Sequence, residues 1–308
     1  MSLTKFLIDQ PQEIKHYYQE HGYVIVRNAL SAEKIDRLLG QVNQKKRDRL
    51  FVFNSQDTHV PTRPRLTEAG FIENSMLNPV NLKLAPRLSK MVERCLVDET
   101  VAKILSLLSG DTHHVMMQNM FFDKSTGTIE HQDHYYLDAD PPGRMIAAWY
   151  ALEDIQEDAG CFFVLPGSHK GRVIARVDGR SFSDHETYRK EILTLIDSTE
   201  YQYKSFPLEK GDVLFWHPYT VHGAYKNLNP QHSRKSLTAH FYPAQLKPLY
   251  AAKAPKLRPS LNPHILMTGS AIAPYVDSVK TYLRFVANAV RGRGPEMVMR
   301  RENYEEAI

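Results

Sequence analysis

The sequence is poor in cysteine and has no long hydrophobic run. Its 308 residues include only two cysteines, Cys95 and Cys161, which excludes a disulfide-stapled scaffold and a zinc site built from thiolates alone. Such sparing use of cysteine is typical of a reducing compartment. No stretch approaches the roughly 18 apolar residues that a membrane helix needs. The N-terminus lacks the apolar core and cleavage site of a signal peptide. We therefore expect a cytoplasmic protein without a membrane partner.

An excess of charge of one sign is also missing. The net charge is only +4 at pH 7, and the basic residues are spread along the chain. A nucleic-acid partner is therefore permitted but not indicated, whereas an anionic substrate or cosubstrate would account for a basic pocket. Apolar residues make up 42% of the chain and charged residues 24%, which is an ordinary globular composition. The length suggests one large domain or two small ones and leaves the oligomeric state open.

The hydrophobic pattern changes character near residue 113. Before this point, apolar residues recur at helical spacing in segments that begin near Pro11, Ser31 and Asp98. From residue 113 to 242, short apolar stretches separated by Gly, Pro and Asn turns predict the strands of a β-sandwich or barrel. A last helix is expected from Asp277, and its apolar face comprises Val279, Tyr282, Leu283, Val286 and Val290.

One short motif predicts a metal site. His131 and Asp133 lie two positions apart in a segment rich in strand-forming residues, and positions i and i+2 of a strand share a face. With 14 histidines in the chain this pair alone is weak evidence, because such pairs more often form a turn or a surface hydrogen bond. The third ligand would be His217 or His222, and spacing alone does not choose between them. Two imidazoles and a carboxylate form the facial triad of non-haem Fe(II) oxygenases.

Arg234 and Ser236 strengthen this interpretation. Oxygenases of this class need a dicarboxylate cosubstrate, and the far carboxylate of 2-oxoglutarate is well matched by a guanidinium fork and a hydroxyl group. We expect adjacent antiparallel strands to bring His222 and Arg234 within a few ångströms. Without the triad, Arg234 would be better interpreted as a surface charge beside Lys235.

Several blocks of sequence resemble the phytanoyl-CoA dioxygenase family of Fe(II)/2-oxoglutarate oxygenases, which includes ectoine hydroxylase. They extend over about three quarters of the chain, and weaker similarity reaches back to residues 22–27. The blocks are residues 131–133, 148–152, 160–170 and 211–218, together with His222, Arg234 and Ser236.

The resemblance implies a mainly β protein with a double-stranded β-helix, or cupin-like jelly-roll, core and helices packed outside. It implies that His131, Asp133 and His222 hold iron and that His217 does not. It also implies a set of residues that bind 2-oxoglutarate: Arg234 and Ser236 at its distal carboxylate, with Gln118 and Trp149 as further contacts. Related halogenases carry a small residue in place of the aspartate, so an intact Asp133 favours hydroxylation.

On this basis we expect a single domain with three parts: a helical support (1–110), a jelly-roll core with the metal site (111–245), and a C-terminal cover with a helix (246–308). We expect Fe(II), 2-oxoglutarate and O2 to be used in hydroxylating a small molecule, in particular a secondary metabolite, with release of succinate and CO2. Residues expected to face the substrate are His134, Tyr135, Tyr136 and Lys124, and segments 51–81 and 243–274 could form a lid. Two alternatives stay open: a cupin-like metal-binding sensor without turnover, and a hydroxylase of protein or nucleic acid.

Overall fold

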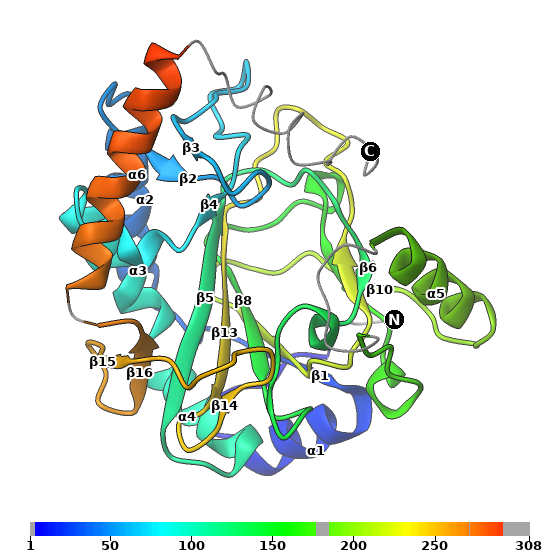
Figure 1. Cartoon of the computed structure of the whole chain (residues 1–308). Coiled ribbons are helices and arrows are strands. Elements are labelled where there is room, and N and C mark those ends of the chain that lie inside the picture. Colours follow the sequence, from blue (N-terminus) through cyan, green and yellow to red (C-terminus); the bar gives the residue numbers. More distant parts are fainter. Residues whose placement is uncertain (1–3, 177–184, 271, 292–308) are drawn as a thin grey trace.

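The computed structural model describes residues 4–176, 185–270 and 272–291, and its core is a pair of β-sheets that face each other (Figure 1). The expected mainly β jelly-roll core with helices outside is confirmed. The end of the expected C-terminal part, residues 292–308, lies outside the described residues.

The larger sheet has eight strands. Their order is β1 (Tyr23–Val26), β11 (Val213–Trp216), β8 (Ile146–Ala151), β13 (Ser236–Pro243), β5 (His114–Phe122), β16 (Ile265–Thr268) and β15 (Leu257–Pro259), with β4 (Met76–Leu77) also paired to β5. The smaller sheet has the order β10 (Lys204–Phe206), β9 (Phe162–Val164), β12 (His222–Ala224) and β6 (Thr128–His131). Two short pairs complete the strands, β14 (Lys247–Pro248) with β7 (Ala139–Asp140), and β2 (Phe53–Asn54) with β3 (Pro61–Thr62).

The helices lie outside these sheets (Figure 1). They are α1 (Pro11–His21), α2 (Ala32–Lys46), α3 (Pro86–Leu96), α4 (Glu99–Ser109), α5 (His185–Asp197) and α6 (Ala273–Val290), with 3-10 turns η1 (Pro79–Asn81), η2 (Asp133–Tyr135), η3 (Glu157–Ala159) and η4 (Ser168–Lys170). Helices begin where they were expected near Ser31 and Asp98, because these side chains accept backbone N–H bonds at the starts of α2 and α4. No helix of the described residues is long and apolar enough to cross a membrane.

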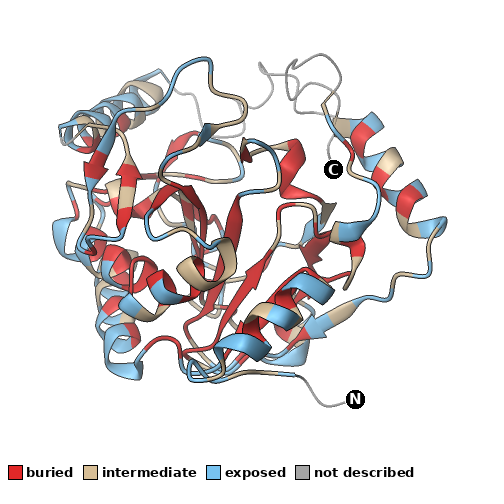
Figure 2. Ribbon diagram, turned by 90° about the horizontal axis from the view of Figure 1, so that it is seen from below, coloured by how far each residue is buried: buried red, intermediate tan, exposed pale blue. Residues whose placement is uncertain are grey.

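Alternation along the strands gives the large sheet two different faces. On β13, Leu237, Ala239 and Phe241 belong to a core that includes the apolar stripes of α1 to α4. The intervening Ser236, Thr238 and His240 must point to the opposite face, toward the smaller sheet, because strand side chains alternate. In Figure 2 the strands are largely buried while the helices expose their outer sides. The polar inner face of β13 therefore lies in the space between the two sheets.

The irregular segment 51–81 is tied to this core by one buried carboxylate. Asp123, which follows β5, accepts a hydrogen bond from the backbone N–H of Ile72 (2.7 Å) and pairs with Lys46 Nζ of α2 (2.6 Å). The same segment contributes β4, which pairs with the edge of β5. Its position beside β5 comes from these long-range contacts, which local sequence patterns do not reveal.

The last helix forms, but its predicted apolar face does not enter the core. Val279, Leu283 and Val290 are exposed, at 46, 60 and 82% of their surface. The opposite side is buried instead, because Ser278 donates to the carbonyl of Asn81 (2.7 Å) and accepts from the backbone N–H of Lys83 (2.9 Å). Polar contacts therefore set the rotation of α6, and the predicted apolar face points away from the core.

Candidate metal centre

Three predicted ligands come together between the sheets. Strands β6 and β12 pair with His131 directly opposite His222, and the ring centroids lie 4.2 Å apart. Asp133 reaches the same point, with its Oδ1 at 3.6 Å from the Nε2 of each histidine. One ligand atom from each residue lies within 4.8 Å of the others. These distances leave space for an ion among the three atoms, and the donor set suits iron.

The backbone conformation that positions Asp133 differs from the expected one. Strand β6 ends at His131, and Asp133 opens the 3-10 turn η2 rather than continuing the strand. The chain turns because the side-chain amide of Gln132 is buried and donates to the carbonyls of Arg172 (3.1 Å) and Tyr219 (2.9 Å). The expectation of a common strand face for His131 and Asp133 was therefore wrong, although the two side chains do converge.

Backbone carbonyls fix which nitrogen of each imidazole faces the centre. The Nδ1–H of His131 donates to the carbonyl of Ile129 (2.8 Å), and that of His222 donates to the carbonyl of Thr220 (2.9 Å). Each Nε2 is therefore the ring nitrogen that is directed toward Asp133 and available to a metal. Burial, together with the neighbouring His131, lowers the pKa of His222 to about 3. His222 is thus neutral at pH 7, as a metal ligand must be.

The carboxylate of Asp133 is held by two residues that the sequence did not indicate. Its Oδ2 accepts a hydrogen bond from Nε1 of Trp216 (2.8 Å) and lies 3.6 Å from Nε2 of His240. Burial opposes ionisation, but His222, His240 and His131 hold the pKa of Asp133 well below its ordinary value. Oδ1 is left to face the two histidines. His240 lies four positions after Ser236 and shares its face of the strand, so alternation could have identified it as a residue of the site. No local sequence pattern could have identified Trp216.

Arg234 is a buried cation without an acidic partner among the described residues. Its side chain is 3% exposed, and no carboxylate of the described residues forms an ion pair with it. Nη1 donates to the carbonyl of Gly160 (3.2 Å), whereas Nε has no hydrogen-bond partner within the described chain. Burial lowers the pKa of Arg234 to about 10. A buried and unsatisfied guanidinium fits an anionic cosubstrate such as 2-oxoglutarate.

The sheets place Arg234 differently from the expected arrangement. Arg234 lies two residues before the start of β13 in the larger sheet, whereas His222 begins β12 of the smaller one, so the two strands are not adjacent. Its backbone N–H donates to the carbonyl of Asp123 (2.9 Å), and its guanidinium lies 5.5 Å from the ring of Phe122 and 5.7 Å from that of Trp149. His222 and Arg234 therefore come from two facing sheets, and not from neighbouring strands of one sheet as predicted.

The other expected cosubstrate residues occupy the inner side of the large sheet. Ser236 is buried at the start of β13, opposite Phe122 of β5. Gln118 is opposite His240, and buried Trp149 is opposite Thr238. The role of each toward a cosubstrate stays a prediction.

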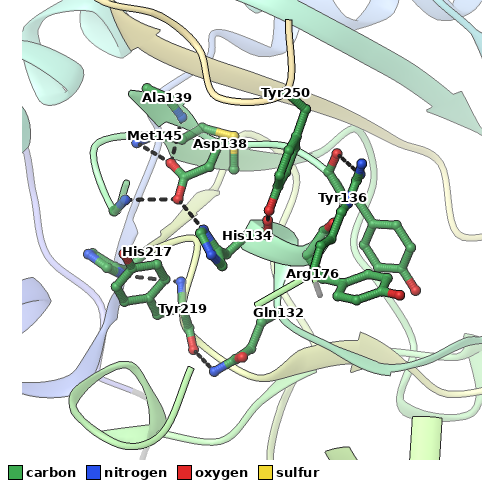
Figure 3. A network of polar contacts seen from close by, with 12 residues as sticks. Gln132, His134, Tyr136, Asp138, Ala139, Met145, Arg176, His217, Tyr219 and Tyr250 are labelled. Carbon is green, nitrogen blue, oxygen red and sulfur yellow. Dashed lines mark hydrogen bonds and ion pairs between the residues drawn. The ribbon is translucent and has the colours of Figure 1, made fainter. Parts of the chain in front are cut away.

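The expected substrate residues separate into two groups. Tyr136 packs edge-on against His131, with centroids 5.7 Å apart. His134 instead binds Asp138 (Nδ1 to Oδ2, 2.8 Å), and Tyr135 stacks on Tyr188 at 3.8 Å. Figure 3 shows the ring of His134 pointing to Asp138, while Tyr250 reaches the carbonyl of His134. Of these side chains, Tyr136 has the packing contact with a predicted ligand.

Two further predicted residues lie apart from the three-residue cluster. Lys124 follows β5 and is partly exposed. His217, the competing third ligand, accepts a hydrogen bond from the backbone N–H of Tyr219 (3.2 Å) and lies near His169, with centroids 5.5 Å apart. Burial lowers the pKa of His217 to about 4. His217 is not part of the group that could hold a metal.

Known proteins resemble this chain along most of its length. A family model described as phytanoyl-CoA dioxygenase (PhyH) matches residues 18–236. Peroxisomal phytanoyl-CoA dioxygenase of Mus musculus is 26% identical over 244 residues, which span 74% of this chain and 67% of the relative. Phytanoyl-CoA dioxygenase 1 of Oryza sativa subsp. japonica is 35% identical over 150 residues, 45% of this chain and 49% of that one.

Solved structures share the fold at low identity. The non-heme α-ketoglutarate-dependent carbocyclase SnoK from nogalamycin biosynthesis has a TM-score of 0.57 at 17% identity, covering 82% of this chain and 91% of its own. The epimerase SnoN, solved with Fe3+, α-ketoglutarate and nogalamycin RO, has a TM-score of 0.57 at 19% identity, covering 84% and 98%. EctD from S. alaskensis, with 2-oxoglutarate and 5-hydroxyectoine, has a TM-score of 0.54 at 18% identity and covers 75% of both chains.

Proposed function

Because the chain belongs to the phytanoyl-CoA dioxygenase family, we propose that it is an Fe(II)- and 2-oxoglutarate-dependent dioxygenase that hydroxylates a C–H bond of a small molecule. The observation that carries this proposal is the pairing of two features in one interior. A cluster of His131, Asp133 and His222 could hold a metal, and buried Arg234 has no acidic partner in the part of the chain that the structure describes. A metal-binding protein without turnover would need the first feature but not the second.

Each residue of the triad has a definite task in this proposal. His131 and His222 present their Nε2 atoms, and Asp133 presents Oδ1, while its Oδ2 accepts a hydrogen bond from Trp216. Three ligands on one side leave the remaining coordination positions of Fe(II) for cosubstrate and O2. When bound, iron and 2-oxoglutarate supply the oxidising chemistry, and succinate and CO2 are released.

The surrounding side chains orient the cosubstrate and exclude water. Arg234 can offer two N–H groups to the distal carboxylate, and Ser236 can add a hydroxyl group. The ring of Phe162 stacks near His222 at 5.5 Å, and Trp216 lies 5.0 Å from the same imidazole. The rings of Phe122 and Trp149 lie near the guanidinium of Arg234 and lower the local dielectric constant there, so its pairing with a carboxylate becomes stronger than in water.

A small-molecule substrate, and specifically a secondary metabolite, is the finer part of the proposal. Three observations support it: proteins of nogalamycin biosynthesis share the fold, the chain has no strong basic excess, and the aromatic ring of Tyr136 lies beside His131. The intact Asp133 favours hydroxylation. Because proteins named carbocyclase and epimerase share this fold, the chemical structure of the product must be determined in addition to its amount.

The test combines turnover with binding. Purified protein with Fe(II), 2-oxoglutarate and O2 should release succinate when screened against small molecules, and each hydroxylated product should carry one atom of 18O from labelled O2. Asp133→Ala should lose succinate release and Fe(II) affinity together. Binding of 2-oxoglutarate can be followed separately by the absorbance of the anaerobic Fe(II) complex. Unchanged iron affinity in Asp133→Ala, with no succinate from any candidate substrate, would refute the proposal.

A further inference from the structure

A complete heptad pattern of apolar residues faces outward on α6. It starts at the N-cap residue and recurs at alternating intervals of four and three positions: Ile272, Val276, Val279, Leu283, Val286 and Val290. These six side chains are 41 to 82% exposed, and together we call them the α6 seam. Apolar residues in this alternation form the contact line of helices that pack along one another. The seam extends over about 27 Å of helix.

The seam points outward because the other side of α6 is fixed by polar contacts. Ser278 bonds to Asn81 and Lys83, and Thr281 Oγ1 accepts from Nδ2 of Asn54 (3.3 Å). Farther along the helix, the guanidinium of Arg63 lies 5.0 Å from the ring of Phe285. Rotating the seam inward would break these contacts. The helix lies at the outside of the molecule (Figure 1), and no described element covers its seam.

An apolar groove runs beside the seam on the same face. It has a volume of about 490 Å³ and lies between α6 and the segments around Leu50 and Leu84, which are 68 and 60% exposed. The seam residues Val279 and Leu283 form one of its walls. A ridge next to a groove of similar character is self-complementary, because a two-fold axis places each ridge in the groove of the other copy.

The size of the apolar surface favours a second copy of the chain as its partner. With Tyr275, Leu50 and Leu84 the seam presents roughly 900 Å² of apolar surface, near the about 800 Å² that each partner buries in a stable interface. The charged residues that line the groove, Lys45 and Asp48, pair with each other at 2.6 Å, so the groove itself presents no net charge to a partner. One flank of α6 carries Lys280, Arg284 and Arg291 against a single Asp277, and the vesicle experiment below distinguishes a lipid surface from a second copy.

We propose that α6 is the contact surface of a homodimer, in which the seam and the adjacent groove of one copy pack against those of another. The dimer does not depend on the metal centre. Because of the two-fold symmetry, each seam residue occurs once in each copy at the interface, so one substitution in the chain removes two contacts. The full chain should therefore sediment at twice its 35.4 kDa mass at micromolar concentration.

The variant that tests this is Leu283→Glu, with Leu228→Glu as its matched control, because Leu228 is also exposed (81%) and lies far from α6 in the sequence. By sedimentation, Leu283→Glu should weaken the dimer by at least about 100-fold, since two leucines lose their burial, and Leu228→Glu should match the wild type. Circular dichroism checks that both variants are folded. A monomeric wild type, or equal effects of the two variants, overturns the proposal.

A cross-linking experiment keeps the test valid if the charged variant fails to fold. Leu283 lies near the middle of the seam, and the two native cysteines, Cys95 and Cys161, are buried. Under mild oxidation Leu283→Cys should give a covalent dimer within minutes, while Leu228→Cys should stay monomeric. No covalent dimer from Leu283→Cys overturns the proposal. So does binding of a monomeric wild type to phosphatidylcholine–phosphatidylserine vesicles, which would assign the seam to a lipid surface.

Discussion

Replacing Arg234 with methionine should move stability and cosubstrate binding in opposite directions. The guanidinium is buried without an acidic partner in the described chain, and this burial lowers its pKa from 12.5 to about 10. At pH 7 the folded protein therefore carries a charge that the unfolded chain holds more easily. The difference of 2.5 pKa units corresponds to about 3 kcal/mol of destabilisation, which a neutral side chain of similar length would remove.

Lost contacts offset part of this gain. The guanidinium lies near the rings of Phe122 and Trp149 and donates to the carbonyl of Gly160, and these contacts together are worth roughly 1–2 kcal/mol. We therefore expect Arg234→Met to raise the free energy of unfolding by about 1–2 kcal/mol in protein free of 2-oxoglutarate. Binding of 2-oxoglutarate should weaken at least about 30-fold, because the distal carboxylate loses its charged partner.

Urea denaturation without cosubstrate measures the first effect, and calorimetric titration of the anaerobic Fe(II) protein measures the second. Arg27→Met is a suitable control, since its side chain is 46% exposed and pairs with Glu209 at 3.3 Å; it should change stability by less than about 0.5 kcal/mol. Iron affinity should be the same in all three proteins. If Arg234→Met is less stable than the wild type and binds 2-oxoglutarate normally, then Arg234 has a structural role and the reasoning fails.

Three further predictions concern the same interior and its support. Trp216→Phe should lower Fe(II) affinity about 10- to 100-fold, because Asp133 loses the N–H that holds its Oδ2; a metal titration equal to the wild type would contradict this. Burial lowers the pKa of His114 from 6.5 to about 4, so its contribution to stability is complete above pH 6.5 and is lost as the pH falls toward 4. Urea denaturation should show that the free energy of unfolding falls less between pH 6.5 and pH 4 in His114→Gln than in the wild type, by up to about 3 kcal/mol. Equal falls in the two proteins would exclude His114 as the cause. Gly160→Ala should lower the free energy of unfolding by about 2–4 kcal/mol, since φ is +85° and a Cβ would lie 2.4 Å from the carbonyl oxygen of Tyr225. The control Gly70→Ala, where φ is +79° and the space around the Cβ is open, should lower it clearly less. Equal losses of stability would show that the close approach to Tyr225 is unimportant.

Local patterns in the chain were sufficient for most of the fold. Helical spacing before residue 113 predicts α1, α2 and α4, and short apolar stretches after it predict the strands of the core, whereas α3 was not predicted. The inner and outer faces of β13 follow from alternation alone, because side chains of a strand point to opposite sides in turn. The boundaries of the last helix were less accurate: it begins at Ala273 rather than Asp277.

The sequence by itself determined the two-residue spacing of His131 and Asp133, the residue types of a facial triad, and, by resemblance, the choice of His222 and Arg234. Only the tertiary structure decided that Trp216 and His240 hold the carboxylate, that His222 and Arg234 come from facing sheets, and that the apolar side of α6 is uncovered. The physical reason is the distance along the chain between the segments that interact. Periodicity records which side chains share a face, whereas the group that a face meets depends on contacts between segments distant in the chain.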